Sequence, residues 1–512
     1  MKRVLLESMF ATRLLETSWM SFGPELCLFI AALGLLLLSV TKQGRNWERV
    51  LVMLGVFASA VFVVFIPKGG YPDPQSASYL AIDMYSRFFH ILFLMSGSLA
   101  MALLTRRLKG RGDIFYALVL LSTCGLMVMV SARDLWLMVL GMELATLSLC
   151  VLVGYLVPSR RLLRVSVYLF LYNTVGSVIL LFGIVFLYGA IGHLHYDQMA
   201  LSLGNQLANK PFLAVGSIFL VVGFGMKMAV VPFHSWMSDA IELTWTPLTN
   251  LLDVTMKLSV LAVFLRWFIV SIDAANASWL GALIGGFSIL AMLFGSFSAV
   301  TQRCVKKVLY YAALAHTGFF LLAIISRQEL GVQAVLVYAL VYVLMYYGAY
   351  TVLSIFEEKV GQSFPIEHFA GFARRYPGLA FCMLIFLCSM SGVPPTAGFM
   401  CRWLSLGSVM KLRSEWGFLL LLSGGLASIL LSYAFLRVLY TMYVVPASDK
   451  AVFTKQPYPL EQRIASTLAV CLLLIGLFPH GLLYISSQHQ LRPNLQNQVQ
   501  RTTKSPALAS RD

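Results

Sequence analysis

The chain is divided into apolar stretches of the length that an α-helix needs to cross a lipid bilayer. About 17–25 apolar residues cover a hydrocarbon core of ~30 Å, where helices bond every backbone polar group internally. Only 12% of the 512 residues are charged, against about 25% in soluble domains, which excludes a soluble enzyme. The pattern predicts an all-α membrane protein of about fourteen spans, near 23–40, 50–66, 84–104, 114–132, 135–156, 165–191, 213–232, 246–270, 279–300, 308–326, 332–355, 378–407, 416–444 and 465–485.

The spans suggest three segments and an internal repeat. We expect an N-terminal segment 1–22, a polytopic domain 23–486 and a polar C-terminal tail 487–512. Spans 4–8 (about 114–270) and 9–13 (about 279–445) each combine central ionisable residues with one proline-broken span. Since five spans is an odd number, two such units in tandem cross the membrane in opposite senses. This predicts inverted repeats with broken helices 7 and 12, the plan of many transporters.

The net charge of +16 is a topology signal. Fourteen spans place both termini on one side and seven connections on the other. Those seven connections hold 19 lysine and arginine residues, more than twice as many as the six connections on the side of the termini. The positive-inside rule therefore predicts that both termini lie outside the cytoplasm. Because the basic residues are spread over many connections, a nucleic-acid surface is not indicated.

Two lysines, Lys227 and Lys257, lie inside apolar spans. A charge at bilayer depth costs roughly 2.5–3.5 kcal/mol on insertion scales, so a functional role is its default interpretation. Pro232 follows Lys227 by five residues and is expected to break that helix. Broken helices at membrane depth occur where they line a cavity, so the pattern predicts an ion path.

Other ionisable residues share these spans. Glu143 lies in the fifth span and could form a switchable pair with a cation or, alternatively, a simple interhelical hydrogen bond. His316 could exchange protons near neutral pH or serve only in packing. Arg402 stays protonated, so it can set a field but hardly release a proton. Asp253 precedes Lys257 by four residues, which predicts a pair on one helix face, with or without a transport role.

Metal and cofactor signals are weak. The eight cysteines are scattered and form no C-x-x-C pair, so neither a zinc site nor an iron–sulfur cluster is supported. The spacing of His193 and His195 alone is a poor metal signal. The 22 tyrosines and nine tryptophans are interpreted as interfacial belts.

Several ordered motifs carry a family resemblance. The strongest is KMAVVPFHSWMSDAIELTWTPLT; the others are GMELATLSLCVLVGY, KKVLYYAALAH, HFAGFARRYP, SGVPPTAGF and SYAFLR. Together they resemble the antiporter-like membrane subunits of respiratory complex I, most closely the subunit N class (subunit 2 in mitochondria). The resemblance runs from about Pro24 to Leu483.

The resemblance implies a proton-translocation path along the membrane centre. The matching positions are Glu143, Lys227, Lys257, His316 and Arg402, and we add Asp253 as the partner of Lys257. Three positions depart from the family pattern: Arg402 stands where a lysine is usual, Tyr168 where a sixth-helix lysine is frequent, and Asp253 where a small residue is usual.

The resemblance also implies the setting. The chain would be the proton-pumping subunit of a bacterial inner-membrane NADH:quinone oxidoreductase, with NADH, flavin, iron–sulfur clusters and quinone in other membrane and peripheral subunits. No cofactor, metal or redox step is then expected in this chain. The alternatives are a subunit of a multi-subunit cation/proton antiporter, a membrane-bound hydrogenase subunit, and a structural scaffold.

Overall fold

A computed structural model of the protein describes residues 22–41, 47–65, 79–81, 83–105, 108, 112–156, 160–204, 210–269, 278–326, 329–360, 364–410, 415–447 and 459–487. These residues are almost entirely helical and contain no β-strand, only isolated bridges. The expected N-terminal segment 1–22 and C-terminal tail 487–512 lie outside the described residues, apart from Phe22 and Ser487.

Among the described residues, twelve spans are long and apolar enough to cross a membrane. They are α2 (Gly23–Thr41), α3 (Glu48–Phe65), α4 (Met84–Leu104), α5 (Gly112–Ser131), α6 (Leu135–Leu156), α7 (Arg160–Ile191), the continuous unit of α11 (Thr246–Thr249), the π-helical η2 (Asn250–Thr255) and α12 (Met256–Trp267), then α13 (Ser278–Thr301), α14 (Val305–Ile325), α15 (Glu329–Val360), α19 (Glu415–Tyr443) and α20 (Pro459–Leu477).

Two further spans are interrupted, which completes the predicted fourteen. The seventh consists of α9 (Lys210–Lys227) and α10 (Ser235–Leu243), and the twelfth of α17 (Pro377–Ser391) and α18 (Ala397–Met410). The expected breaks in helices 7 and 12 are thereby confirmed. Short helices occupy some connections, namely α8 (Tyr196–Gly204), η5 (Ile366–Phe369) and α16 (Phe372–Arg375), and α21 (His480–Ser487) follows the last span.

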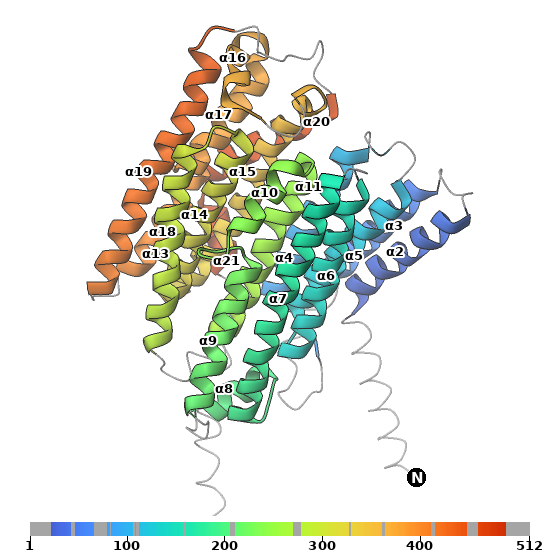
Figure 1. Ribbon diagram of the computed structural model, residues 1–512, viewed down its shortest axis with the longest axis vertical. Helices are drawn as coiled ribbons and strands as arrows, with labels where there is room; N and C mark the ends of the chain where they lie inside the picture. Colours follow the sequence, from blue (N-terminus) through green and yellow to red (C-terminus); the bar gives the residue numbers. More distant parts are fainter. Residues whose placement is uncertain are drawn as a thin grey trace, which may run out of the picture.

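The helices lie side by side with a common tilt, and the chain progresses across the molecule (Figure 1). The blue helices α2 and α3 form one edge, and α13 and α19 lie at the opposite edge. The unit 246–267 and the helix α14 are enclosed by other helices, and α15 packs against α4, α14, α17, α18 and α20. These enclosed spans can hold charged side chains away from lipid.

The order of elements recurs along the chain. A closely packed helix pair, a long helix, a proline-broken span and one further helix occur first as α5–α12 and then as α13–α19. In both pairs, glycine allows the backbones to approach. A Cβ on Gly125 of α5 would lie 2.6 Å from the Gly141 carbonyl oxygen of α6, and a Cβ on Gly318 of α14 would lie 2.8 Å from the Ser288 carbonyl oxygen of α13. The residue boundaries of the two repeats stay a prediction.

Several element bounds differ from expectation. The last span ends at Leu477 instead of continuing to 485, because Pro479 disfavours helical geometry at the residue before it. The helix α9 ends at Lys227, earlier than the expected 232. The segment 233–245, expected as a plain connection, contains α10, which packs against α7 and α14.

The tyrosine interpretation was wrong for the centre of the molecule. Tyrosines on α14 and α15 are fully buried in the core instead of lying at a membrane interface; they are Tyr310, Tyr338, Tyr342, Tyr346, Tyr347 and Tyr350. Their hydrophobic rings fit the core, whereas their hydroxyl groups need polar partners there.

Candidate functional site: a row of buried charges

The first ion pair joins α6 to the end of α9. The Nζ atom of Lys227 lies 3.0 Å from Oε1 of Glu143, which also accepts a hydrogen bond from the Ser177 hydroxyl of α7. The Lys227 side chain is completely buried, whereas that of Glu143 is 29% exposed. Three helices therefore meet at one carboxylate oxygen.

The break in the seventh span positions this lysine. Lys227 is the last residue of α9, and residues 228–234 form turns before α10 begins. Within them, the amide N–H of Val230 donates to the Gly225 carbonyl, and that of Phe233 donates to the Val230 carbonyl. A lysine at the C-terminus of a helix is favoured by the partial negative charge of the last carbonyl groups.

The second ion pair is Asp253–Lys257, within the continuous span 246–267. Nζ of Lys257 contacts Oδ1 of Asp253, as the four-residue spacing predicts, and at most 1% of either side chain is exposed. Nζ also lies 4.8 Å from the ring centre of Tyr310. Asp253 belongs to the π-helical η2, and π-helical turns inside α-helices are frequent at functional sites.

His316 lies at the middle of α14 and is 1% exposed. Its Nδ1 is in hydrogen-bond contact with the Tyr338 hydroxyl of α15. The rings of Tyr342 and Tyr346 lie 6.2 Å and 5.9 Å from the imidazole. The histidine is therefore surrounded by phenol groups, an environment that the sequence interpretation had not identified.

Arg402 connects the two halves of the twelfth span. Its guanidinium nitrogens donate to the carbonyl oxygens of Met390 and Ser391, at the C-terminal end of α17. These carbonyl groups have no intrahelical partner, so the arginine on α18 caps α17. Gly392 ends α17 with φ of +74°, and a Cβ there would lie 2.8 Å from the arginine side chain.

The six predicted site residues thus lie on elements that pack in sequence across the molecule: α6 on α7, α7 on α9, α9 on α12, α12 on α14, and α14 on α18. The structure brings Glu143 to Lys227, and Asp253 to Lys257, in direct contact. Tyr168, by contrast, is 58% exposed on α7 and takes no part in this row.

A third buried ion pair was missed by the sequence interpretation. Nζ of Lys306 lies 3.0 Å from Oε1 of Glu357, which also accepts from the backbone N–H and the hydroxyl of Thr246, each at 2.8 Å. Glu357 therefore fixes the start of the span that carries Asp253 and Lys257. The sequence feature that could have revealed this pair is the charge of Lys306 near the start of an apolar span.

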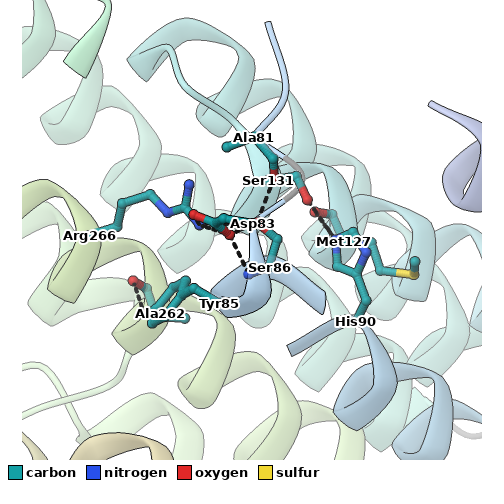
Figure 2. A network of polar contacts seen from close by, with 9 residues as sticks. All are labelled: Ala81, Asp83, Tyr85, Ser86, His90, Met127, Ser131, Ala262 and Arg266. Atoms are coloured by element: carbon teal, nitrogen blue, oxygen red, sulfur yellow. Dashed lines mark hydrogen bonds and ion pairs between the residues drawn. The ribbon is translucent and has the colours of Figure 1, made fainter. Parts of the chain in front are cut away.

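A second polar network lies at the start of α4 (Figure 2). Nη2 of Arg266, from α12, lies 2.9 Å from both carboxylate oxygens of Asp83, which also caps α4 through the Ser86 N–H at 2.7 Å. Burial raises the pKa of Asp83, but Arg266 and Ser86 together outweigh burial and hold the pKa below its usual value. In the same network, Nε2 of His90 lies 2.6 Å from the Ser131 hydroxyl.

No metal-ligand cluster of three or more His, Cys, Asp or Glu residues occurs among the described residues. His195, directly before α8, lies 3.8 Å from Asp197 in the first turn of that helix. Burial and the positive charge of Arg133 lower the pKa of His195, in spite of the opposing charge of Asp197.

Comparison with known proteins identifies the family of the chain. Residues 132–432 match the family described as "NADH:quinone oxidoreductase/Mrp antiporter, TM". The chain belongs to this family. The NADH-quinone oxidoreductase subunit N of Desulforamulus reducens is 30% identical over 486 residues, covering 92% of this chain and 98% of that protein.

Solved structures share the fold. A chain of respiratory complex I from Thermus thermophilus matches with a TM-score of 0.75 and 25% identity, over 91% of this chain and 99% of that one. A chain of the Mrp complex from Dietzia sp. also gives a TM-score of 0.75, at 18% identity, over 92% of this chain and 96% of that one. These two chains share the helical fold of the protein, and the expected fold class is confirmed.

Proposed function

We propose that the chain is the proton-translocating membrane subunit of an NADH:quinone oxidoreductase, in the position of subunit N. The observation that supports it best is the row of opposite charges at the helix break and the π-helical turn, where the partly exposed Glu143 pairs with the buried Lys227 and the buried Asp253 pairs with Lys257. Charges enclosed at membrane depth are typical of proton relays. The relatedness to subunit N over more than nine-tenths of the chain supports this complex as the setting.

In this mechanism, a proton that enters at Glu143–Lys227 breaks that ion pair. The positive charge of Lys227, no longer paired, then acts on Lys257, and Lys257 acts on His316. Moving one charge against 100 mV requires about 2.3 kcal/mol. A tenfold change in a proton-binding constant corresponds to about 1.4 kcal/mol, so a change of about fifty-fold in one step is sufficient. Rearranged ion pairs can produce such a change without a large movement of helices.

The proposal also includes the partner subunits and the membrane in which the chain works. NADH, flavin, iron–sulfur clusters and quinone belong to partner subunits, so this chain contributes translocation and no redox step. It lies in a bacterial inner membrane with both termini outside the cytoplasm, as the distribution of basic residues favours. A reporter enzyme that is active only in the cytoplasm should be inactive when it is fused to the C-terminus. An active fusion would show that the termini lie in the cytoplasm.

The test is to purify the native assembly and identify its subunits, and then to measure proton uptake by reconstituted vesicles per NADH oxidised. Recovery with NADH-oxidising and quinone-reducing subunits supports the proposal. Recovery with antiporter subunits alone supports the second candidate function, a subunit of a multi-subunit cation/proton antiporter. The fold shared with the Dietzia Mrp chain favours this candidate. Lys257→Ala should reduce the proton yield; an unchanged yield in a fully assembled complex would leave only a scaffold role.

A further inference from the structure

Four tyrosines form a column on one face of α15. Tyr338, Tyr342, Tyr346 and Tyr350 follow one another at four-residue spacing, which places them above one another on a helix. Each of them is at most 1% exposed. We call these four residues the tyrosine column.

Most polar atoms along this column lack a protein partner. The hydroxyl groups of Tyr342, Tyr346 and Tyr350 have no hydrogen-bond partner among the described residues. The same holds for Nε2 of His316 and, beyond their mutual contact, for the charged atoms of Asp253 and Lys257. Buried polar groups in native proteins are almost always satisfied, and ordered water supplies the partner where the protein does not. A concentration of such groups around one helix face therefore indicates a water-binding path.

The column runs along the second half of the row of charges, from the Asp253–Lys257 pair toward Arg402. Asp253 acts electrostatically on Tyr342, Tyr346 and Tyr350. The ring centres of Tyr342 and Tyr346 are 4.6 Å apart, and those of Tyr346 and Tyr350 are 6.3 Å apart.

At the other end, Tyr338 contacts Nδ1 of His316, and its hydroxyl also interacts with the Arg402 guanidinium. Phenol groups thus extend from the Asp253–Lys257 pair to Arg402.

We propose that the tyrosine column is a hydrated proton relay that carries protons from Lys257 to His316 and on toward Arg402. This inference rests on the proposed function and assigns new residues to it. Phenylalanine would fill the same space without burying a hydroxyl group, so four buried hydroxyls on one face need a reason beyond packing.

Each transfer conserves charge and atoms. The ammonium group of Lys257 gives one proton to a water molecule or phenol oxygen, and becomes a neutral amine. Each phenol accepts a proton on one side as its own O–H bond breaks toward the next acceptor, so it is neutral before and after. The last acceptor is Nε2 of His316, which becomes an imidazolium and then releases the proton to water near Arg402.

The test compares four variants of the complete complex in vesicles, with proton uptake per NADH oxidised as the readout. Lys257→Ala defines the loss that depends on this subunit. Tyr342→Phe and Tyr346→Phe remove only a hydroxyl group and should lower the Lys257-dependent uptake per NADH about tenfold or more, as expected when a proton-transfer group is lost. Tyr347→Phe is the matched control, since its equally buried hydroxyl already bonds the Thr255 hydroxyl at 2.9 Å.

Different outcomes would contradict the proposed function and the proposed tyrosine relay. If Lys257→Ala changes nothing, the proposed function is wrong. If Lys257→Ala abolishes the uptake while both column variants match Tyr347→Phe, the relay is wrong. A high-resolution density map of the unmodified complex gives an answer independent of any variant: ordered water within about 3.2 Å of the Tyr342, Tyr346 and Tyr350 hydroxyls is expected, and its absence at all three would overturn the relay.

Discussion

At the scale of single residues, the site depends on how each charge is neutralised. Lys227 and Lys257 are both buried, yet their carboxylate partners differ in position. Glu143 comes from another helix, so relative movement of α6 and α9 can separate it from Lys227. Asp253 and Lys257 share one continuous helix, so this pair cannot separate without a change in side-chain conformation or local helix geometry. The first pair is therefore suited to gating, and the second to a fixed relay position.

Glu143→Gln should preserve assembly but lower the Lys257-dependent part of the proton uptake per NADH about tenfold, because the neutral amide cannot form a charge pair with Lys227. Glu143→Asp should have a milder effect, since the charge is kept with a shorter reach. The exposed Glu329 at the start of α15 offers a control, as Glu329→Gln removes a similar charge outside the site. Normal pumping by an assembled Glu143→Gln complex would contradict the gating role.

The Asp253–Lys257 pair should show strong thermodynamic coupling. Asp253→Asn leaves a buried lysine unpaired, which should destabilise the protein by about 3 kcal/mol, and Lys257→Met should act similarly on the aspartate. The double variant should be clearly more stable than the sum of the two losses predicts. Melting temperatures of the purified complexes provide the comparison, and simple additivity would show that the two side chains do not stabilise each other.

At the scale of elements, the broken helices place polar groups in the interior, and contacts at each break bond backbone groups that the interruption frees. The α9–α10 break is closed by local turns, whereas the α17–α18 break depends on a side chain, since Arg402 caps the last carbonyls of α17. A guanidinium in this position holds two helix ends together and keeps a permanent positive charge beside the tyrosine column.

This double role gives Arg402 a distinctive mutational pattern. Arg402→Lys should keep most of the proton uptake, because the positive field remains and an ammonium can still bond a carbonyl. Arg402→Ala should lose coupling and lower the melting temperature, since the end of α17 loses its cap. Proton uptake and melting temperature are measured on both variants. An alanine variant that pumps normally would reduce Arg402 to an anchor.

At the scale of the whole molecule, polar connections join the N-terminal helices to the enclosed core. The Asp83–Arg266 pair ties the start of α4 to the end of α12, and the Tyr85 hydroxyl donates to the Ala262 carbonyl at 2.8 Å (Figure 2). The Glu357–Thr246 contacts secure the other end of the same 246–267 span. The span that carries Lys257 is therefore held at both ends.

Asp83→Asn should destabilise the protein by about 3 kcal/mol, because it leaves Arg266 largely buried without its counter-charge. The pKa of Asp83 is below its usual value, so its contribution is fully present at neutral pH and is lost only as the pH falls through that lowered pKa. Asp239→Asn is the control, since the Asp239 side chain is 79% exposed. Equal melting temperatures for the two variants at pH 7 would show that the pair is not stabilising.

The amino-acid sequence by itself determined the fold class, the number of spans and the identity of the main charged residues. Apolar length decides which segments can enter a bilayer, proline marks the broken spans, and a charge at that depth stands out because it is costly. The Asp253–Lys257 contact also followed from local helix geometry. All of these depend on residues that are near neighbours in the chain.

Only the tertiary structure decided which distant residues share the interior. The helical spacing of the α15 tyrosines gave no indication of whether they would face headgroups or the core, because that depends on which helices surround α15. The Lys306–Glu357 and Asp83–Arg266 pairs are separated by 51 and 183 residues, so no periodicity in the sequence connects them. Burial and partner choice arise from the packing of whole helices, and packing is a property of the assembled chain.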